Sequence, residues 1–512
     1  MPKRSTGCFE CRKRKVRCDE AKPECNTCLR RGTKCPGYRP LQSFILHRFE
    51  EKSERPSLIK EDDNRYRYAN HKAQEEETSS GESEQGVVGL LQPPGRRASG
   101  APVLRQVSPI AIERVQHIGE LIWLYLPRSD PHTLPPPSAL MLTLPQLPAT
   151  SDVLLAAVDA LSAAQLAVAN RNYQLVNRSR SLYGTALSKM MHTIQYPDRA
   201  VEDETLLATY LLTLYEVFVG ITSGHGFFYH VQGLLRLVKQ RGPKSFGNRL
   251  NMQIFHAIRY NSLSIGYHVR KGSMLDSPSW MAVTASAAKS DPYVALIDIC
   301  IRIPRLLERT DTLSTPLSPA ALDALIADSL ALAAEAKSWF STFEKHGPRY
   351  TSVPISDFEG FTQICDDKET FPEAYDFFAF GAGICYMIYW MSLLILQSNT
   401  FKLLLQNQSP EHPFTPQEMY LWDRELSGYA DSSVRCVPFN CRTEVGYVGR
   451  FGSLTPLVVA RKYFEAKKME RESAWCEKVY QNARIPGLYS TPIPMEPLKS
   501  MQRLVQRSGR YI

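Results

Sequence analysis

The chain has 512 residues and a formal net charge of +9, with 43% apolar and 22% charged residues. This composition is typical of a globular protein and excludes disordered and fibrous classes, and the length allows roughly two to four domains. Residues 1–40 hold twelve basic and four acidic side chains, a net of +8, whereas the other 472 residues hold 49 and 48, a net of +1. One short end is therefore suited to a polyanion, and the remainder is electrically ordinary.

Cysteine is distributed just as unevenly. Six of the twelve cysteines lie between Cys8 and Cys35, and the other six are scattered among apolar residues, where we expect reduced core cysteines. The first residues, MPKRSTGCFE, contain no apolar segment of a secretory signal, so we expect an intracellular, reducing compartment. In that setting clustered cysteines bind metal more often than they form disulfides.

The clustered cysteines form an internal repeat. The segments CFECRKRKVRC (8–18) and CNTCLRRGTKC (25–35) share the spacing C-x2-C-x6-C, and the connection between them contains Pro23, a turn-forming residue. Each half predicts a turn carrying ligands, a short helix and a closing ligand, and the two halves together predict a pseudo-twofold unit.

The number of thiolates indicates how many metal ions the cluster holds. Zinc is bound tetrahedrally by thiolates. One zinc would leave two thiolates without a metal, two separate zincs would need eight, and two zincs sharing two bridging thiolates need six. We therefore expect two zinc ions with the following ligands: Cys8, Cys11, Cys18, Cys25, Cys28 and Cys35. Because sulfur fills every position and the segment has few apolar side chains, both ions are expected to be structural and to supply the folding free energy.

The cluster resembles the binuclear zinc cluster of fungal transcription factors. The stretches CRKRKVRCD (11–19), KPEC (22–25) and CPGY (35–38) match the pattern of that family. The resemblance implies that two of the cysteines bridge both metals and that the other four complete the sites in pairs. The bridging ligands would be Cys8 and Cys25, and the pairs would be Cys11 with Cys18 and Cys28 with Cys35.

The same resemblance implies contacts with double-stranded DNA. The first short helix would enter the major groove, where Lys15, with Arg14 beside it, would read a CGG-like triplet by donating hydrogen bonds to guanine O6 and N7. Phosphate contacts, which set register without carrying sequence information, are expected from the remaining basic residues: Arg12, Lys13, Arg17, Arg30, Arg31 and Lys34. A nuclear-import signal is an alternative role for the same basic run.

Residues 41–107 are polar and charged, and they end in a stretch rich in Pro and Gly, LLQPPGRRASGAP (90–102). This composition predicts a flexible, mostly disordered linker. No pattern of three heptads occurs in it, so a coiled-coil dimer is not expected and the question of a homodimer stays open. RRAS (96–99) resembles a site for a basophilic kinase.

From about Ser108, stretches with a period of 3.6 residues dominate and predict an all-α domain. The expected helices are 110–126, 153–169, 179–194, 204–220, 227–242, 293–310 and 319–347. Residues 377–396 carry no charge and are long enough to span a bilayer. We interpret them as the central buried helix of a bundle, and no membrane partner is expected.

This helical region also resembles the regulatory region of one large subgroup of fungal regulators. The resemblance runs loosely from about residue 110 to 480 and rests on Tyr183, Tyr215-Glu216, His230-x-x-Gly233 and Arg241-Gly242-Pro243. It implies a regulatory domain, for which a small-molecule effector is an open alternative.

The sequence thus predicts a small binuclear zinc-cluster module (1–40), a flexible linker (41–107) and a large all-α regulatory domain (108–512). The expected function is a nuclear, sequence-specific and zinc-dependent regulator of RNA polymerase II transcription, with the transcription machinery or co-regulators as partners and a metabolic gene cluster as a target. A second hypothesis is an enzyme tethered to DNA, but phosphate-loop, dinucleotide, nucleophile-elbow and zinc-protease motifs are all missing from the sequence, so no enzyme is expected. A third is a membrane-held precursor anchored by residues 377–396.

Overall fold

The computed structural model describes residues 8–14, 16–19, 21, 25–33, 35, 109–128, 133–147, 151–170, 172–219, 225–313, 319–347, 349–407 and 414–483. The chain divides into two units, residues 1–99 and 100–512, and each is described by itself. The expected linker and the RRAS tetrapeptide lie outside the described residues.

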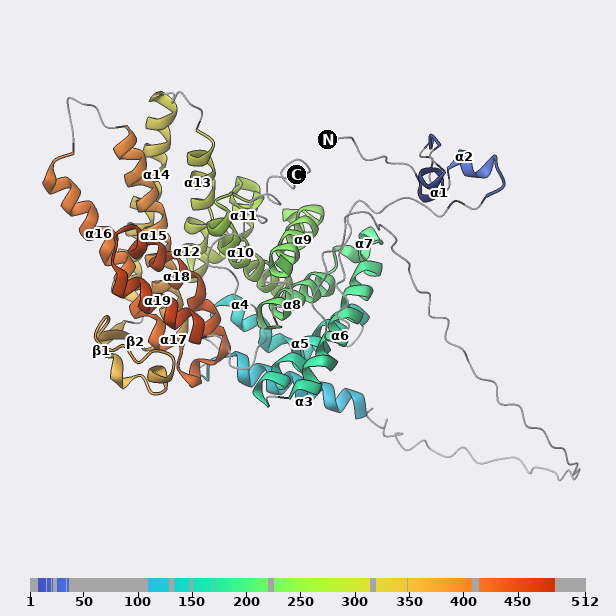
Figure 1. The fold of residues 1–512 in the computed structure, drawn as a ribbon, viewed down its shortest axis with the longest axis horizontal. Coiled ribbons are helices and arrows are strands. Elements are labelled where there is room, and N and C mark those ends of the chain that lie inside the picture. Colours follow the sequence, from blue (N-terminus) through green and yellow to red (C-terminus); the bar gives the residue numbers. More distant parts are fainter. Residues whose placement is uncertain are drawn as a thin grey trace, which may run out of the picture. The chain divides into compact units, whose positions relative to one another are not determined.

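The small unit contains two short helices, α1 (Phe9–Lys13) and α2 (Asn26–Leu29) (Figure 1). Its buried side chains are cysteines, four of which are 0% exposed, whereas Val16 and Leu29 are 39% and 53% exposed. A module whose interior is sulfur rather than aliphatic carbon gains little from the hydrophobic effect. Its folding therefore depends on what the sulfurs bind.

The large unit is a bundle of helices (Figure 1) whose described residues form two large buried apolar clusters and a small one around Phe228. The helices of its first half are α3 (Pro109–Tyr125), α4 (Pro136–Ala139), α5 (Asp152–Ala169), α6 (Tyr173–Thr193), α7 (Pro197–Ala200), α8 (Asp203–Val219), α9 (His225–Arg241), α10 (Arg249–Val269) and α11 (Pro278–Thr284). Those of its second half are α12 (Pro292–Cys300), α13 (Ile303–Asp311), α14 (Pro319–His346), α15 (Phe380–Gln406), α16 (Pro416–Arg435), α17 (Val437–Asn440), α18 (Gly446–Ala466) and α19 (Glu470–Asn482).

Two elements differ from the sequence-based expectation. The single helix predicted over 293–310 is wrong, because the structure divides it into α12 and α13. Pro304, in the first turn of α13, has no N–H to donate, and its ring would clash with a carbonyl of a continuous helix. A small antiparallel sheet also occurs, with β1 (Tyr350–Pro354) paired to β2 (Glu373–Phe377), and it delays the start of α15 to Phe380.

Helix α15 is the one helix among the described residues that is long and apolar enough to cross a membrane. In the structure 89% of its most apolar window is buried, and the helix packs against α14, α16 and α18. A helix that is apolar on all sides is buried either in a large core or in a bilayer. Here the surrounding helices cover it, as expected for the central helix of a bundle.

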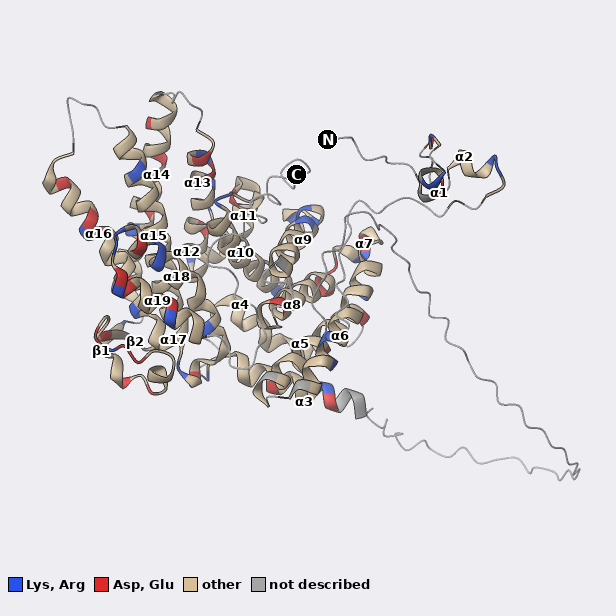
Figure 2. Ribbon diagram, viewed as in Figure 1, with Lys and Arg blue, Asp and Glu red and all other residues tan. Residues whose placement is uncertain are grey.

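Charge is spread evenly over the large unit. Figure 2 shows Lys and Arg interspersed with Asp and Glu along its helices, and many of them form ion pairs between neighbouring elements, such as Arg114 with Asp159 and Arg442 with Asp376. The large unit therefore presents no extended basic face among its described residues.

Candidate metal centre and nucleic-acid interface

The thiols of the small unit converge on one another. The Sγ atom of Cys8 lies 3.6 Å from that of Cys25 and 3.7 Å from that of Cys28, and the Sγ atom of Cys11 lies 3.7 Å from Cys25 and 3.9 Å from Cys28. These separations are well above the roughly 2.05 Å of a disulfide bond, and all six cysteines are free thiols.

The six sulfurs form two overlapping sets of four, in each of which all sulfurs lie within 4.8 Å of one another. One set contains Cys8, Cys11, Cys18 and Cys25, and the other contains Cys8, Cys25, Cys28 and Cys35. Only Cys8 and Cys25 belong to both sets. The arrangement is that of two adjoining four-sulfur sites with a shared edge.

The distances between sulfurs fit zinc. Four thiolates at about 2.3 Å from one tetrahedral ion lie about 3.8 Å from each other, and the Cys8–Cys28 and Cys11–Cys25 separations are both 3.7 Å. With every vertex a sulfur, neither site has a position left for a water or a substrate, which is the pattern of a structural metal.

Backbone hydrogen bonds repeat between the two halves at an interval of 17 residues. The N–H of Cys11 donates to Cys8 Sγ at 3.4 Å, and the N–H of Cys28 donates to Cys25 Sγ at 3.3 Å. Such N–H donors stabilise a thiolate that binds metal and fix its orientation. The geometry confirms the internal repeat predicted from the cysteine spacing.

Asp19 couples the two halves in a way that the repeat does not predict. Its carboxylate accepts hydrogen bonds from the N–H groups of Asn26 and Thr27, at 3.0 and 3.3 Å, and from the Thr27 hydroxyl at 3.3 Å. These N–H groups belong to the first turn of α2, where a carboxylate is favoured. The residue that follows the third cysteine therefore holds the helix of the second half.

The sulfurs are protonated more easily than ordinary thiols. Burial, and then the neighbouring thiols, raise the pKa of Cys11 to about 12, and burial also raises the pKa values of Cys8 and Cys25. Zinc must therefore displace protons from these thiols as it binds, which makes metal affinity fall as the pH falls.

Several of the basic residues expected to contact DNA are free to do so. Lys13, Arg17, Arg30 and Arg31 are exposed, and none of them has an ion-pair or hydrogen-bond partner for its side chain among the described residues. Arg14 is half-buried at the end of α1, where its N–H donates to the Glu10 carbonyl at 3.0 Å.

Three of the expected DNA-contact residues cannot be placed. Lys15 and Lys34 lie outside the described residues, and the Arg12 side chain does as well.

In the large unit, the residues that carried the second resemblance come together in the fold. The Tyr183 hydroxyl on α6 donates to Glu216 Oε1 on α8 at 2.5 Å and lies 2.8 Å from His230 Nε2 on α9. Burial lowers the pKa of His230 to about 4, so its imidazole is neutral. Since the Tyr183 proton points to Glu216, His230 Nε2 must carry the proton that bonds to the Tyr183 oxygen.

The Glu216 carboxylate is 3% exposed and lies against the first turn of α9. A Cβ atom at Gly226 would come within 2.1 Å of Glu216 Cδ, so a larger residue there would displace the Glu216 carboxylate. The Tyr183 ring also stacks on Tyr215 at 4.2 Å. Sequence reasoning gave these residues no individual role, whereas the fold joins them in one buried polar contact among three helices.

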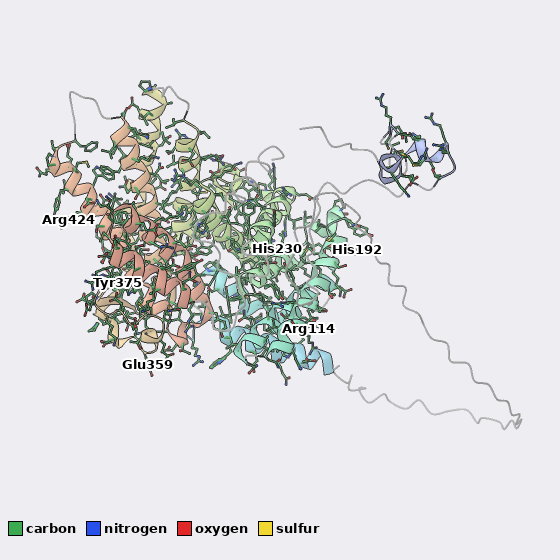
Figure 3. All side chains as sticks on the ribbon, viewed as in Figure 1. Arg114, His192, His230, Glu359, Tyr375 and Arg424 are labelled. Carbon is green, nitrogen blue, oxygen red and sulfur yellow. The ribbon has the colours of Figure 1, made fainter. Side chains whose placement is uncertain are left out.

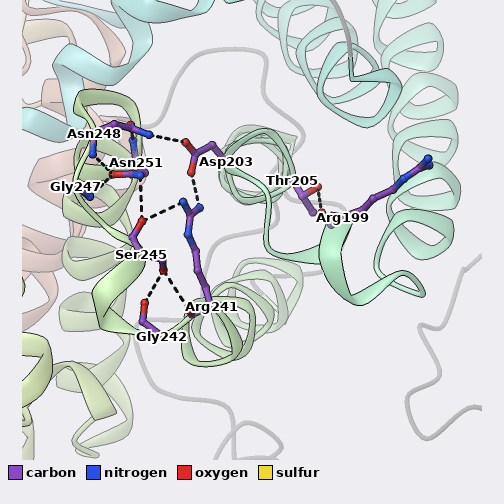
Figure 4. Close-up of polar contacts among 9 residues, drawn as sticks. All are labelled: Arg199, Asp203, Thr205, Arg241, Gly242, Ser245, Gly247, Asn248 and Asn251. Carbon is purple, nitrogen blue, oxygen red and sulfur yellow. Dashed lines mark hydrogen bonds and ion pairs between the residues drawn. The ribbon is translucent and has the colours of Figure 1, made fainter.

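The Arg241-Gly242-Pro243 segment lies at a second polar contact between helices (Figure 4). Arg241, at the end of α9, forms an ion pair with Asp203 at the start of α8. Gly242 has a φ of +80°, which favours glycine, and Asn248, which caps α10, donates to the same Asp203 at 3.3 Å. One carboxylate thereby connects the ends of three helices.

The remaining cysteines bear out the expectation of reduced core cysteines. All six cysteines of the large unit are buried free thiols. In the loop after Cys365, Asp366 pairs with Lys478, and Asp367 accepts hydrogen bonds from the N–H groups of Glu369 and Thr370. Their contacts are those of a structural loop.

Family models match a part of each unit. Residues 6–43 match the fungal Zn(2)-Cys(6) binuclear cluster domain, and residues 128–290 match the fungal specific transcription factor domain. No solved structure matches the chain.

Curated relatives match over short stretches. An uncharacterized protein of Emericella nidulans is 26% identical over 165 residues, which cover 30% of this chain and 35% of that protein. The aspercryptin biosynthesis cluster-specific transcription regulator of Emericella nidulans is 54% identical over 35 residues, 7% of this chain and 6% of its own. White-opaque regulator 2 of Candida albicans is 53% identical over 39 residues, 8% and 9% of the two chains. The matches thus span about a third or less of the length of these relatives.

A six-thiolate metal centre with exposed basic residues on the same small unit defines that unit as a zinc-cluster module. Residues 6–43 of this unit are similar to the fungal binuclear zinc clusters, and in the large unit residues 128–290 are similar to the fungal specific transcription factor domain. The cluster binds two zinc ions.

Proposed function

We propose that this chain is a sequence-specific, zinc-dependent DNA-binding regulator of RNA polymerase II transcription that acts in the nucleus. The observation that carries the proposal is the pair of four-sulfur sites sharing Cys8 and Cys25, with basic residues on the same small unit that are exposed and have no partner among the described residues. A structural metal fixes the module, and the free cations supply its attraction to phosphate. No enzymatic activity is part of the proposal.

The ligand assignment follows the two sulfur sets. Cys8 and Cys25 bridge both zinc ions, Cys11 and Cys18 complete one site, and Cys28 and Cys35 complete the other. In this arrangement the cluster carries six thiolate charges against four zinc charges, a net of about −2, and the module keeps a positive balance of about +6 for DNA.

Base and phosphate contacts divide along the basic run. Lys15, with Arg14 beside it, reads a CGG-like triplet in the major groove. The other basic residues position the module on the backbone: Arg12, Lys13, Arg17, Arg30, Arg31 and Lys34. The half-site arrangement depends on whether two chains pair, which the binding stoichiometry on DNA would measure.

A comparison of two lysine variants tests the proposal. Lys15→Ala should weaken binding to a CGG-containing duplex by about 1–3 kcal/mol and relax the preference for that triplet. Lys13→Ala, its matched control, should weaken binding to all duplexes by a similar factor, because a phosphate contact reads no base. If Lys15→Ala keeps full affinity and selectivity for the CGG duplex, the base assignment is wrong.

The proposed function gives each segment of the chain a role. We propose residues 1–40 as the DNA-binding module, 41–107 as the linker and 108–512 as a regulatory domain that engages the transcription machinery or co-regulators. A metabolic gene cluster is the proposed target, supported by the name of one relative, a biosynthesis cluster-specific regulator that is 54% identical over 35 residues. Genomic occupancy mapping with transcript profiles of a deletion strain would decide the target genes.

A further inference from the structure

An open groove of about 470 Å³ runs along α16 in the large unit. Its lining comes from α15 and α16: Trp390, Leu421, Arg424, Glu425, Gly428, Tyr429 and Ser432. Trp390 is almost buried and lies 5.4 Å, ring to ring, from Tyr375 of β2, so the floor of the groove is held in place by aromatic packing.

The two charged residues of the groove, Arg424 and Glu425, differ in whether their charges have partners. Glu425 forms an ion pair with Lys337 at 2.5 Å and accepts a hydrogen bond from the Tyr429 hydroxyl at 2.6 Å. Arg424 is exposed on α16 (Figure 3) and has no ion-pair or hydrogen-bond partner among the described residues. The groove therefore offers one free positive charge and no free negative one.

Apolar side chains continue beyond the groove toward the start of α16. Leu421 and Tyr420 are 52% and 63% exposed, and Met419 is 38% exposed. Gly428 lies about two helical turns beyond Leu421, and a Cβ atom placed on it would meet nothing within 4 Å. Exposed leucine and aromatic side chains that gather beside a groove are typical of a protein-binding surface.

The dimensions favour a peptide over a small molecule. The lining residues of α16 extend from Leu421 to Ser432, a rise of about 16 Å at 1.5 Å per residue, or three helical turns. Small-molecule sites enclose most of their ligand, whereas this groove is open along its length. An amphipathic helix laid into a groove reaches such a site through anchors about one turn apart.

We propose that the α16 groove, defined by its seven lining residues, docks an acidic amphipathic helix of a partner protein. Apolar side chains of the partner would pack on Trp390 and Leu421, and a carboxylate would pair with Arg424. Charge complementarity selects this occupant, because the neutralised Glu425 leaves Arg424 to attract an anion. The inference concerns the large unit only and is independent of DNA reading by the zinc module.

Binding of a designed peptide to the full-length, zinc-loaded protein tests the proposal. The probe is a fluorescein-labelled helical peptide of about four turns, with leucines on one face and glutamates beside them. A scrambled peptide of the same composition is its control. Fluorescence anisotropy at physiological salt should show saturable binding of the first peptide and none of the second.

Two substitutions locate the site. Arg424→Glu should weaken the acidic peptide about tenfold, the scale of one charge-assisted contact, and should improve binding of a peptide with lysine in place of glutamate. Gly428→Phe should abolish binding of both peptides by filling the groove. The matched controls are Arg249→Glu on α10, an exposed and unpaired arginine, and Gly119→Phe on α3, an exposed glycine with open space around it.

Several outcomes would overturn the proposal. These are the absence of peptide binding, equal binding of the scrambled peptide, or an Arg424→Glu variant with unchanged affinity. Sedimentation of the parent as a dimer that Gly428→Phe dissociates would instead assign the groove to a second copy of this chain. Affinity for a CGG duplex, measured on the same samples, should not change with these variants, so failure here and failure of the proposed DNA binding are distinguishable.

Discussion

The Tyr183 hydroxyl donates a 2.5 Å hydrogen bond to Glu216 Oε1, and this contact joins α6 to α8 in the interior of the helical unit. Tyr183 is 7% exposed and Glu216 3% exposed, so water cannot replace either partner. A buried carboxylate that loses its donor bears the full cost of desolvation. The contact is therefore expected to contribute measurably to stability.

Replacement of the hydroxyl measures that contribution. Tyr183→Phe should lower the free energy of unfolding by about 1–3 kcal/mol, because it leaves Glu216 and His230 without their shared partner. Tyr229→Phe on α9, where the side chain is 45% exposed, is the matched control and should change little. Urea unfolding followed by circular dichroism gives both values, and equal stabilities of the two variants would contradict the prediction.

Stability of the helical unit should depend on pH through three histidines, of which His256 is buried and His230 and His268 are half-buried. Burial lowers the pKa values of His230, His256 and His268 from 6.5 to about 4, helped by Arg259 at His256 and by Lys462 at His268. Between these values the unfolded chain binds more protons than the folded one, so stability is present above pH 6.5 and is lost as the pH falls toward 4. His230→Gln should reduce the slope of unfolding free energy against pH in this window. An unchanged slope would show that His230 does not contribute to the pH dependence.

The zinc content of cysteine variants should show which sulfurs are shared by the two metal sites. The parent should hold two zinc ions per chain, and Cys25→Ala should lose most of both, because Cys25 is a member of both sulfur sets. Cys365→Ala, which removes a buried cysteine of the large unit, should retain both ions. Atomic emission on purified protein provides the count, and a Cys25→Ala variant that keeps one full equivalent would refute the bridging assignment.

The Arg241–Asp203 pair should stabilise the arrangement of α8, α9 and α10. Both side chains are partly buried, at 12% and 21% exposure. Asp203 also accepts a hydrogen bond from the Asn248 side chain. Arg241→Ala should cost about 1–3 kcal/mol, because it leaves a partly buried carboxylate with a weaker partner. Arg236→Ala, at an exposed position on the same helix with no partner among the described residues, should stay within about 0.5 kcal/mol of the parent. Thermal unfolding of the two variants checks the difference.

DNA affinity should fall steeply with salt. Each phosphate neutralised by a basic residue contributes a slope of about −0.9 in a plot of log affinity against log salt concentration. Substitution of exposed Arg30 or Arg31 by alanine should make the slope shallower by about one such increment. A flat response between low and physiological salt would show that the exposed cations do not meet the backbone.

Local spacing determined the metal centre. Six thiols at C-x2-C-x6-C spacing predict two metals without knowledge of the fold, because ligand type and count fix the tetrahedral options. The capping contact of Asp19 on α2 was not predictable in the same way, since it joins residues seven and eight positions apart through a turn whose conformation the spacing does not specify.

In the large unit the period of apolar residues predicted most of the helices it was applied to, since burial on one face is a local signal. It failed at residues 293–310, where Pro304 divides the helix, and it did not predict the paired strands β1 and β2, whose partners are separated by a loop.

The sequence by itself determined that this protein has a basic, six-cysteine end for two zinc ions and a helical body of nearly neutral charge, because composition, spacing and periodicity are read along the chain. Only the tertiary structure decided that Tyr183, Glu216 and His230 meet, that Asp203 joins three helix ends, and that Arg424 lies beside an open groove with no partner among the described residues. Such contacts depend on how helices distant in sequence pack together, and no local pattern encodes that packing.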